Sequence, residues 1–432
     1  MEFTSEFMHA LTVMEGGKKS IFITGRAGTG KSTLLSYFKS ITKRKVVVLA
    51  PTGVAALNVG GQTIHSFCRF KPDITLEKVD RIAGASFATI NMYKSIETMV
   101  IDEISMVRAD LLDCLDKFMR LNGPNPDLAF GGVQVIFVGD LYQLPPVVTG
   151  DEREIFSGPY KSPYFFDSQV FKELNLEFIE LNKYFRHSDP EFIRILNAIR
   201  NNTATEKDLE KINERFDDSF NSIFSEGMYI TLTTTNSLAD SINNRHLNVI
   251  PNKLHSYVAS IEGKFNRGKY PADEILSIKE DAQVMMLNND SNKRWVNGSL
   301  ARVVCVQPDI GAGERIVVEL SDGSTAEVLP YTWKASRLSY DQPNRKIIST
   351  DVGSFTQYPI MLAWAVTIHK SQGKTFEKVI IDVGEGTFAH GQLYVALSRC
   401  TTLSGIVLTK KLHLTDIITD PHIAQFHKSH FG

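Results

Sequence analysis

The chain has 432 residues, of which 43% are hydrophobic and 22% are charged, a composition typical of folded globular proteins. It contains no apolar run long enough to span a membrane, and its first residues lack the basic leader of a secretory signal. The four cysteines, Cys68, Cys114, Cys305 and Cys400, are single and widely spaced. They fit neither a zinc pattern nor a disulfide framework and predict an intracellular, reducing compartment.

The net charge of −2 argues against a nucleic-acid-binding protein, but the charges are unevenly distributed. Residues 16–72 include ten Lys and Arg and no Asp or Glu, and residues 353–376 also lack acids. Such segments attract phosphate groups. Charge alone is equally compatible with a solvated basic face beside a nucleotide site.

The first predicted elements form a strand, a loop and a helix. Residues 21–24 (IFIT) predict a buried strand, residues 25–33 (GRAGTGKST) match G-x-x-x-x-G-K-[ST], and residues 34–41 (LLSYFKSI) predict an amphipathic helix. In this setting backbone N–H groups surround the phosphates, Lys31 reaches the β- and γ-phosphates, and Ser32 ligates Mg²⁺. The candidate nucleotide contacts are Gly25, Gly28, Thr29, Gly30, Lys31, Ser32 and Thr33.

Two later strands are predicted to carry polar groups to the same edge of a parallel sheet. Residues 98–101 form a strand that is followed by Asp102 and Glu103, which we expect to hold Mg²⁺ and to activate the attacking water, respectively. Taken alone, such an acidic pair often only caps a helix. Residues 133–140 form the next strand, and Gln143 beyond it is a candidate sensor of the γ-phosphate or an ordinary loop residue.

The order of several motifs resembles superfamily 1 helicases of the 5′-to-3′ class, most closely the Pif-type (petite integration frequency) family and more distantly the RecD helicases. The motifs are GRAGTGKS, VVVLAPTGVAALNVGGQTIHSF, VIDEISM, VGDLYQLPPV, LNKYFRHSD, TIHKSQGKTF and GQLYVALSR. The segment EISMVRADLLDCLDKFMR resembles the signature of the Pif-type branch. The matches extend from about residue 15 to 410, so we expect a helicase core without an accessory domain in this sequence.

This resemblance implies a role for further residues. Arg186 and Arg399 match arginine fingers of the second motor domain, and Gly373 matches a residue that approaches the γ-phosphate. An arbitrary arginine is more often part of a surface salt bridge. The implied contacts to DNA phosphates and bases are Thr52, Gly53, Thr63, His65 and Phe67 in the first domain and Asn236, Thr367, His369, Lys370 and Ser371 in the second.

Three positions depart from the pattern of the family. No Gln precedes Gln62, so the usual adenine-recognising Gln ahead of the phosphate loop is absent. Glu280 and Asp281 stand where relatives often have a glycine turn, and Ala301 stands where a second glycine is usual.

The predicted fold class is α/β, with two RecA-like P-loop domains that each contain a parallel sheet. The first domain is expected over residues 1–63 and 77–165, with a wedge insertion at 64–76 that composition alone would make a loop. The second is expected over 166–294 and 355–432. The alternating pattern of residues 295–354 predicts strands, and the resemblance makes this insertion an SH3-like β-barrel.

The resemblance implies an ATP- and Mg²⁺-dependent 5′-to-3′ DNA helicase that acts as a monomeric core. Its implied partners are single-stranded DNA and single-strand/duplex junctions such as forks, together with RNA–DNA hybrids and G-quadruplexes, in repair, recombination and telomere maintenance. Two alternatives stay open. One is an RNA helicase of the same superfamily, because contacts to phosphates look alike in both. The other is a P-loop NTPase that is not a helicase and uses the nucleotide as a switch.

Overall fold

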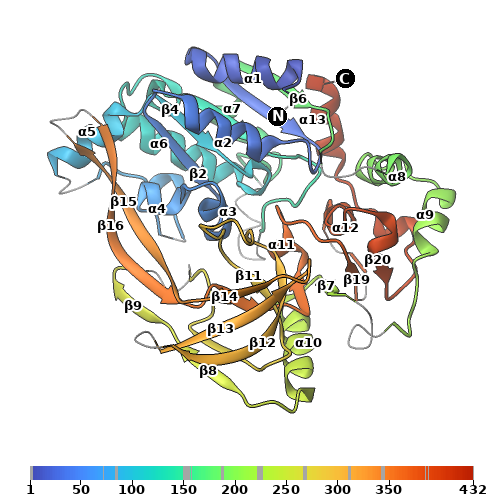
Figure 1. Cartoon of the computed structure of the whole chain (residues 1–432). Coiled ribbons are helices and arrows are strands. Elements are labelled where there is room, and N and C mark those ends of the chain that lie inside the picture. Colours follow the sequence, from blue (N-terminus) through green and yellow to red (C-terminus); the bar gives the residue numbers. More distant parts are fainter. Residues whose placement is uncertain are drawn as a thin grey trace. The chain divides into compact units, whose positions relative to one another are not determined.

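The structure is a computed structural model that describes residues 3–71, 73–82, 86–148, 156, 158–185, 189–220, 227–265, 270–309, 313–341, 346–384, 386–387 and 389–431. The chain divides into two compact units (Figure 1). Unit 1 comprises Met1–Arg186, Arg337–Thr350 and Thr419–Gly432, and unit 2 comprises His187–Ser336 and Asp351–Ile418.

Unit 1 is built around a six-stranded sheet whose strand order is β3-β2-β4-β5-β1-β6. All of its pairings are parallel, so the carboxyl ends of the strands lie along one edge. The strands β1, β4 and β5 are almost wholly buried apolar runs, as expected for a parallel sheet covered on both faces. The bounds are β1 Ser20–Gly25, β2 Val46–Ala50, β3 Gln62–Thr63, β4 Thr98–Ile101, β5 Gln134–Val138 and β6 Leu176–Leu181.

Helices cover both faces of this sheet. Ile21 and Ile23 of β1 share a core with α1 and α2, whereas Phe22 faces the other way, toward Phe165 and Phe426. This alternation follows from the two-residue period of a strand. The helices of unit 1 are α1 Ser5–Gly16, α2 Lys31–Ile41, α3 Gly53–Asn58, α4 Ile64–Cys68, α5 Phe87–Ser95, α6 Ala109–Asn122, α7 Gln169–Glu173 and α13 Pro421–Phe431.

Two elements that the sequence places in the second domain make their contacts with the sheet of unit 1. Strand β6 pairs with β1 along its whole length, and α13 packs on β6 through Phe178 and His430. Both elements therefore belong to unit 1, although the sequence analysis assigned residues 166–186 and the C-terminal helix to the second domain. The other expected domain boundaries and the wedge role of residues 64–76 stay predictions.

Unit 2 contains a second parallel sheet, with the order β18-β7-β19-β20. A second parallel sheet confirms the predicted α/β class with two RecA-like cores. Its strands are β7 Ile230–Thr233, β18 Ala365–Thr367, β19 Val379–Asp382 and β20 Ile406–Leu408. The helices of unit 2 are α8 Pro190–Arg200, α9 Glu206–Asn213, α10 Asn236–Val249, α11 Ile368–Ser371 and α12 Gln392–Leu397.

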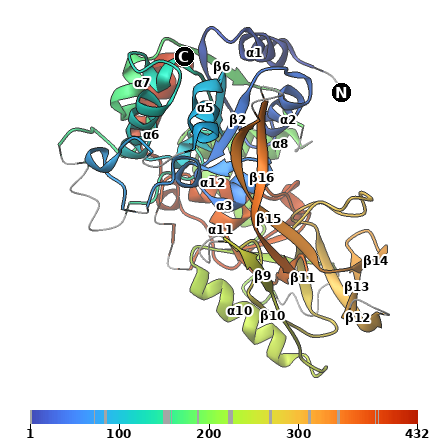
Figure 2. The same ribbon diagram turned by 90° about the vertical axis from the view of Figure 1, so that its left-hand side faces the viewer.

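The remaining strands form antiparallel sheets, in which β12, β13 and β14 lie side by side (Figure 2). The largest has the order β14-β13-β12-β11-β17, and the others are β15-β16-β9 and β10-β8. Among the described residues each sheet ends in two edge strands, so none closes into the expected barrel. The bounds are β8 His255–Val258, β9 Ser260–Gly263, β10 Ile275–Ile278, β11 Gln283–Met286, β12 Leu300–Asp309, β13 Gly313–Leu320, β14 Thr325–Val328, β15 Tyr331–Asp341, β16 Lys346–Gln357 and β17 Ile360–Leu362.

Two of the departures from the family pattern lie next to the five-stranded sheet. Asp281 has a φ of 70°, the left-handed conformation that a glycine would adopt more easily, and its backbone N–H donates to Val303. Ala301 is fully buried in β12, opposite Val284 and Leu320. The chain therefore keeps the turn without the glycine.

No described helix is both long enough and apolar enough to cross a membrane.

Candidate functional site

The loop that joins β1 to α2 has the backbone geometry of an anion cradle. Gly25, Gly28 and Gly30 have φ values of 154°, 82° and 90°, which other residues rarely adopt. A Cβ on Gly25 would lie 2.7 Å from the carbonyl oxygen of Leu181, so only glycine fits between the loop and β6. Helix α2 begins at Lys31, so the free N–H groups of its first turn open onto this loop.

The loop places the predicted nucleotide contacts together. The Lys31 ammonium donates to the carbonyl oxygens of Gly25 (2.5 Å) and Arg26 (3.0 Å), and Thr29 donates its hydroxyl to Arg26 (2.9 Å). Ser32 is exposed on the first turn of α2, and Thr33 follows it half-buried. The lysine charge is thus held at the centre of the loop.

Asp102 and Glu103 follow β4 at the same edge of the sheet. Asp102 is only 8% exposed, and its backbone N–H donates to Leu49 (2.9 Å). Burial raises the pKa of Asp102 to about 6, although the Glu103 amide and the Lys31 charge act in the opposite direction. Glu103 adopts a left-handed conformation (φ 50°, ψ 44°), a strained backbone of the kind found at functional sites.

The loop after β5 carries a residue that the sequence analysis did not assign. Asp140 is fully buried, and its carboxylate accepts hydrogen bonds from the Tyr142 amide (3.2 Å) and the Gln143 side chain (3.3 Å). Gln143, the predicted phosphate sensor, is therefore held in place by Asp140. A buried Asp directly after an apolar strand was the available signal in the sequence.

The loop after β6 also reaches the phosphate-binding loop. The Phe185 amide donates to the Gly28 carbonyl (2.9 Å), and the Phe185 ring lies 3.5 Å from the place of a Cβ on Gly30. This ring is 56% exposed, and the Arg26 guanidinium lies 5.7 Å from the neighbouring Tyr184 ring. No motif in the sequence gave Phe185 a role. Arg186, a predicted arginine finger, lies outside the described residues.

The oxygen donors at this edge suit Mg²⁺. The Ser32 hydroxyl and the Asp102 carboxylate are hard ligands, and Mg²⁺ commonly takes one or two protein oxygens together with substrate phosphates. The described residues contain no group of three or more His, Cys, Asp or Glu side chains that could hold a metal by themselves. The residues present therefore fit a metal that is shared with a phosphate.

The predicted DNA contacts of unit 1 lie beyond β2 and β3, and they differ in accessibility. Thr52 caps α3, which begins at Gly53, and Thr63 caps α4, so both hydroxyls accept backbone N–H groups. His65 is half-buried. Phe67 is only 2% exposed, with its ring against Tyr93 (5.2 Å) and Phe118 (6.1 Å). The Phe67 ring therefore supports α4 from the core, and its implied contact with DNA stays a prediction.

In unit 2, Arg399 and Gly373 lie on neighbouring segments. Arg399 is 1% exposed and donates to Val395 (2.9 Å), Ser398 (2.7 Å) and the carbonyl of Lys374 (3.2 Å). Gly373 has a φ of 80° and open space where a side chain would stand. Burial also lowers the pKa of Lys374 to about 8, and its ammonium donates to Asn297 (2.6 Å).

The predicted DNA contacts of unit 2 cluster around α11 and the start of α10. Thr367 caps α11 by accepting the Lys370 amide, and Ser371 is buried and donates to Ile368 (2.7 Å). Lys370 and Asn236 are exposed, and burial lowers the pKa of the half-buried His369. The hydroxyl groups of Thr367 and Ser371 therefore stabilise the turn at α11, whereas Lys370 and Asn236 are exposed and available to a ligand.

Comparisons with known proteins agree with this arrangement. Residues 5–210 match the family model of the PIF1-like helicases, and residues 362–407 match that of the UvrD-like helicase C-terminal domain. The chain is 30% identical over 439 residues to the ATP-dependent DNA helicase Pif1 of Campylobacter jejuni, with 95% of both chains covered. The crystal structure of Bacteroides sp Pif1 in complex with ADP-AlF4 is 38% identical, with a TM-score of 0.88 over 99% of this chain and 97% of that chain.

Eukaryotic relatives are longer. The human ATP-dependent DNA helicase PIF1 is 34% identical over 403 residues, and the chain spans 58% of its length. The chain spans 64% of the length of the yeast helicase RRM3, to which it is 28% identical. Bacteroides Pif1 has also been solved bound to ssDNA, and this structure has a TM-score of 0.72 and 38% identity to the chain.

Proposed function

The chain belongs to the PIF1-like helicase family of ATP-dependent DNA helicases, and we propose from this premise that it moves 5′-to-3′ along single-stranded DNA and opens forked duplexes. The observation that carries the proposal is the set of groups at the carboxyl edge of the unit 1 sheet. That edge carries the glycine loop with Lys31 and the buried Asp102. It also carries Glu103, whose backbone is strained, and Gln143, whose side chain donates a hydrogen bond to Asp140.

Each of these groups has a proposed task. The loop amides and Lys31 bind the phosphates of ATP, and Ser32 and Asp102 hold Mg²⁺, which offsets phosphate charge when bound. Glu103 accepts the proton of the attacking water, and Gln143 responds to the γ-phosphate. In unit 2, Arg399 stabilises charge on the transferring phosphoryl group and Gly373 approaches it. We propose Arg186, which the family pattern also matches, as the other arginine finger. Turnover therefore requires both units.

The proposed DNA contacts also lie in both units. We propose that residues of both units hold the phosphate backbone of the strand. They are Thr52, Gly53, Thr63 and His65 in unit 1 and Asn236, Thr367, His369, Lys370 and Ser371 in unit 2. Lys370 supplies charge, whereas the capping hydroxyls orient backbone N–H groups. Bacteroides Pif1 has been solved bound to ssDNA, which supports a single strand as the ligand. We also propose RNA–DNA hybrids and G-quadruplexes as substrates, because the chain belongs to this helicase family.

The test is the unwinding of partial duplexes that carry either a 5′ or a 3′ overhang. We expect ATP-dependent unwinding of the 5′-overhang substrate, and none by the Lys31→Ala variant, because the loop loses the charge that faces the phosphates. The variant should still bind single strands. Unwinding by Lys31→Ala would contradict the nucleotide site, and preference for a 3′ overhang would contradict the polarity.

The RNA helicase and the P-loop switch, the two alternative functions, can be distinguished by measuring how DNA and RNA strands stimulate ATP hydrolysis. Stimulation by an RNA strand that exceeds that by the matched DNA strand would indicate an RNA helicase. A rate that no strand alters would indicate a P-loop switch. We expect the DNA strand to stimulate hydrolysis more than the RNA strand.

A further inference from the structure

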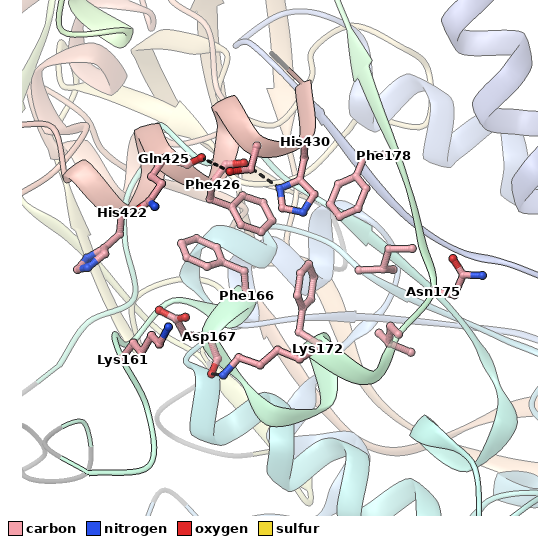
Figure 3. A pocket seen from close by; sticks show the side chains of 14 residues that line it. Lys161, Phe166, Asp167, Lys172, Asn175, Phe178, His422, Gln425, Phe426 and His430 are labelled. Carbon is pink, nitrogen blue, oxygen red and sulfur yellow. Dashed lines mark hydrogen bonds between the residues drawn. The ribbon is translucent and has the colours of Figure 1, made fainter.

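A hollow of about 610 Å³ opens on unit 1 between residues 161–178 and the C-terminal helix α13 (Figure 3). We call it the α13 pocket. Its volume lies within the range of ordinary ligand pockets. It contains none of the residues assigned above to ATP or DNA, so the proposed function leaves it without a role.

The floor of the α13 pocket consists of stacked aromatic rings. Phe426 stacks on Phe166 (4.3 Å between centroids, 15° between planes) and contacts His430 (4.4 Å). His430 in turn lies 4.2 Å from Phe178. The faces of Phe426 are therefore covered by its neighbours. The edges of aromatic rings carry partial positive charge, and they favour edge-to-face contacts and acidic oxygens.

The rim of the α13 pocket carries two lysines and two histidines. Lys161 and Lys172 are exposed and line it from one side, while His422 and His430 line it from α13 (Figure 3). Within the described part of the chain, neither lysine has an ion-pair partner. The Lys172 ammonium donates to the backbone carbonyl of Asp167 (3.3 Å).

Asp167 provides the single carboxylate among the lining residues, and it is already engaged. Its Oδ2 accepts the Ser162 hydroxyl at 2.5 Å. The Nδ1 of His422 lies 3.2 Å from Asp420, a residue outside the lining set. Among the lining residues the charges of Lys161 and Lys172 outnumber the one carboxylate charge of Asp167. An anionic ligand would therefore meet net positive charge at the rim.

We propose that the α13 pocket binds an acidic linear segment of a partner protein that carries one apolar anchor side chain. The anchor enters between the ring edges, the acidic residues meet Lys161 and Lys172, and the amides of Asn175 and Gln425 are available to the peptide backbone. A nucleotide or DNA base fits less well at Phe426, because bases bind proteins largely by stacking on free ring faces and this ring is already stacked against Phe166 and packed against His430.

The test measures the fluorescence anisotropy of a labelled peptide built of Asp, Gly and Ser with a single Phe. The Lys161→Glu/Lys172→Glu variant should weaken binding by about tenfold or more, because two attractive charges become repulsive. Replacing the Phe of the peptide with Ser should also weaken binding to the wild-type protein. DNA-stimulated ATP hydrolysis should stay unchanged, because the pocket lies apart from the nucleotide loop.

The matched control is Lys43→Glu/Lys94→Glu, which makes the same charge change at two exposed lysines of unit 1 outside the pocket. Wild-type affinity for the peptide in this control supports the proposal. The proposal is overturned if the wild-type protein does not bind the peptide, or if both double variants lose affinity equally. It is also overturned if the pocket variant loses affinity for a labelled DNA strand that displaces the peptide, since the ligand would then be nucleic acid.

Discussion

Asp102 combines a catalytic position with an environment that opposes its charge. The sequence predicts its position, because an acid directly after a buried strand lies at the carboxyl edge of a parallel sheet. Its burial is a property of the folded chain, and burial raises the pKa of Asp102 from its ordinary 3.8 to about 6. The folded protein therefore holds this proton across a pH range in which the unfolded chain releases it.

Replacing Asp102 with Asn should therefore stabilise the protein while it stops Mg²⁺-dependent hydrolysis. Above pH 6 the wild-type carboxylate is charged and buried, which lowers the free energy of unfolding by up to about 3 kcal/mol relative to a neutral group. The advantage of the Asn variant should shrink as the pH falls from about 6 toward 4, where the wild-type residue is protonated in the fold. Denaturant unfolding without nucleotide, measured at several pH values, checks this.

The exposed Asp127 provides the control, since Asp127→Asn should leave stability nearly unchanged at every pH. If Asp102→Asn is no more stable than the wild-type protein at pH 8, burial does not penalise the Asp102 charge.

Two phenylalanines show what a motif does not reveal about single residues. Phe67 occurs in a predicted DNA-contacting motif, yet its ring is in the core against Tyr93 and Phe118. Phe185 received no role from the sequence, yet its exposed ring lies beside the phosphate loop. Both are apolar rings in or beside predicted motifs, Phe67 in the short helix α4 and Phe185 in a loop, and only tertiary packing decides which one faces solvent.

At the scale of elements, sequence reasoning succeeded where the signal is local. The strand–loop–helix of residues 20–41 and the parallel sheets follow from apolar runs, glycine spacing and motif order. It failed for α13, whose apolar residues Ile423, Phe426 and Phe431 predict a helix with one buried side but do not identify its partner. The chain returns from unit 2 to pack this helix on β6, a contact distant in sequence.

The attachment of α13 should depend chiefly on Phe426, whose ring contacts six others. Phe426→Ala should lower the free energy of unfolding by about 2–3 kcal/mol, somewhat below the cost of truncating a fully buried phenylalanine because this ring is half-buried. The partner rings are Phe22, Phe165, Phe166, Phe171, Phe178 and His430. Thermal and denaturant unfolding measure the change. Lys428→Ala, at an exposed position of the same helix, should change stability by less than about 0.5 kcal/mol, and an equal loss in both variants would contradict the assigned role of Phe426.

For the whole molecule, the proposed catalytic set is divided between two units that each have their own parallel sheet. Unit 1 carries the phosphate loop and the acids, and unit 2 carries Arg399 and Gly373. Motif order leads to the expectation of such a division, and the roles of these residues, the wedge role and the polarity stay predictions. It did not predict that Arg399 is satisfied within its own unit by three hydrogen bonds.

Arg399→Ala should separate nucleotide binding from turnover. The phosphate loop and Lys31 are intact in this variant, so its Kd for ATP should change little. The kcat should fall by about a thousandfold or more, since an arginine that stabilises the transferring phosphoryl group contributes that much in related NTPases. Equilibrium binding of a fluorescent ATP analogue and single-turnover hydrolysis with single-stranded DNA measure the two quantities.

Because Arg399 is also buried, loss of structure must be separated from loss of chemistry. Arg200→Ala removes another buried arginine of unit 2, 2% exposed at the end of α8 and outside the proposed catalytic set. It should lower the thermal midpoint but retain kcat per folded molecule. Equal losses of kcat in the two variants, at matched folded fractions, would show that Arg399 acts by supporting unit 2 rather than as a finger that turnover requires.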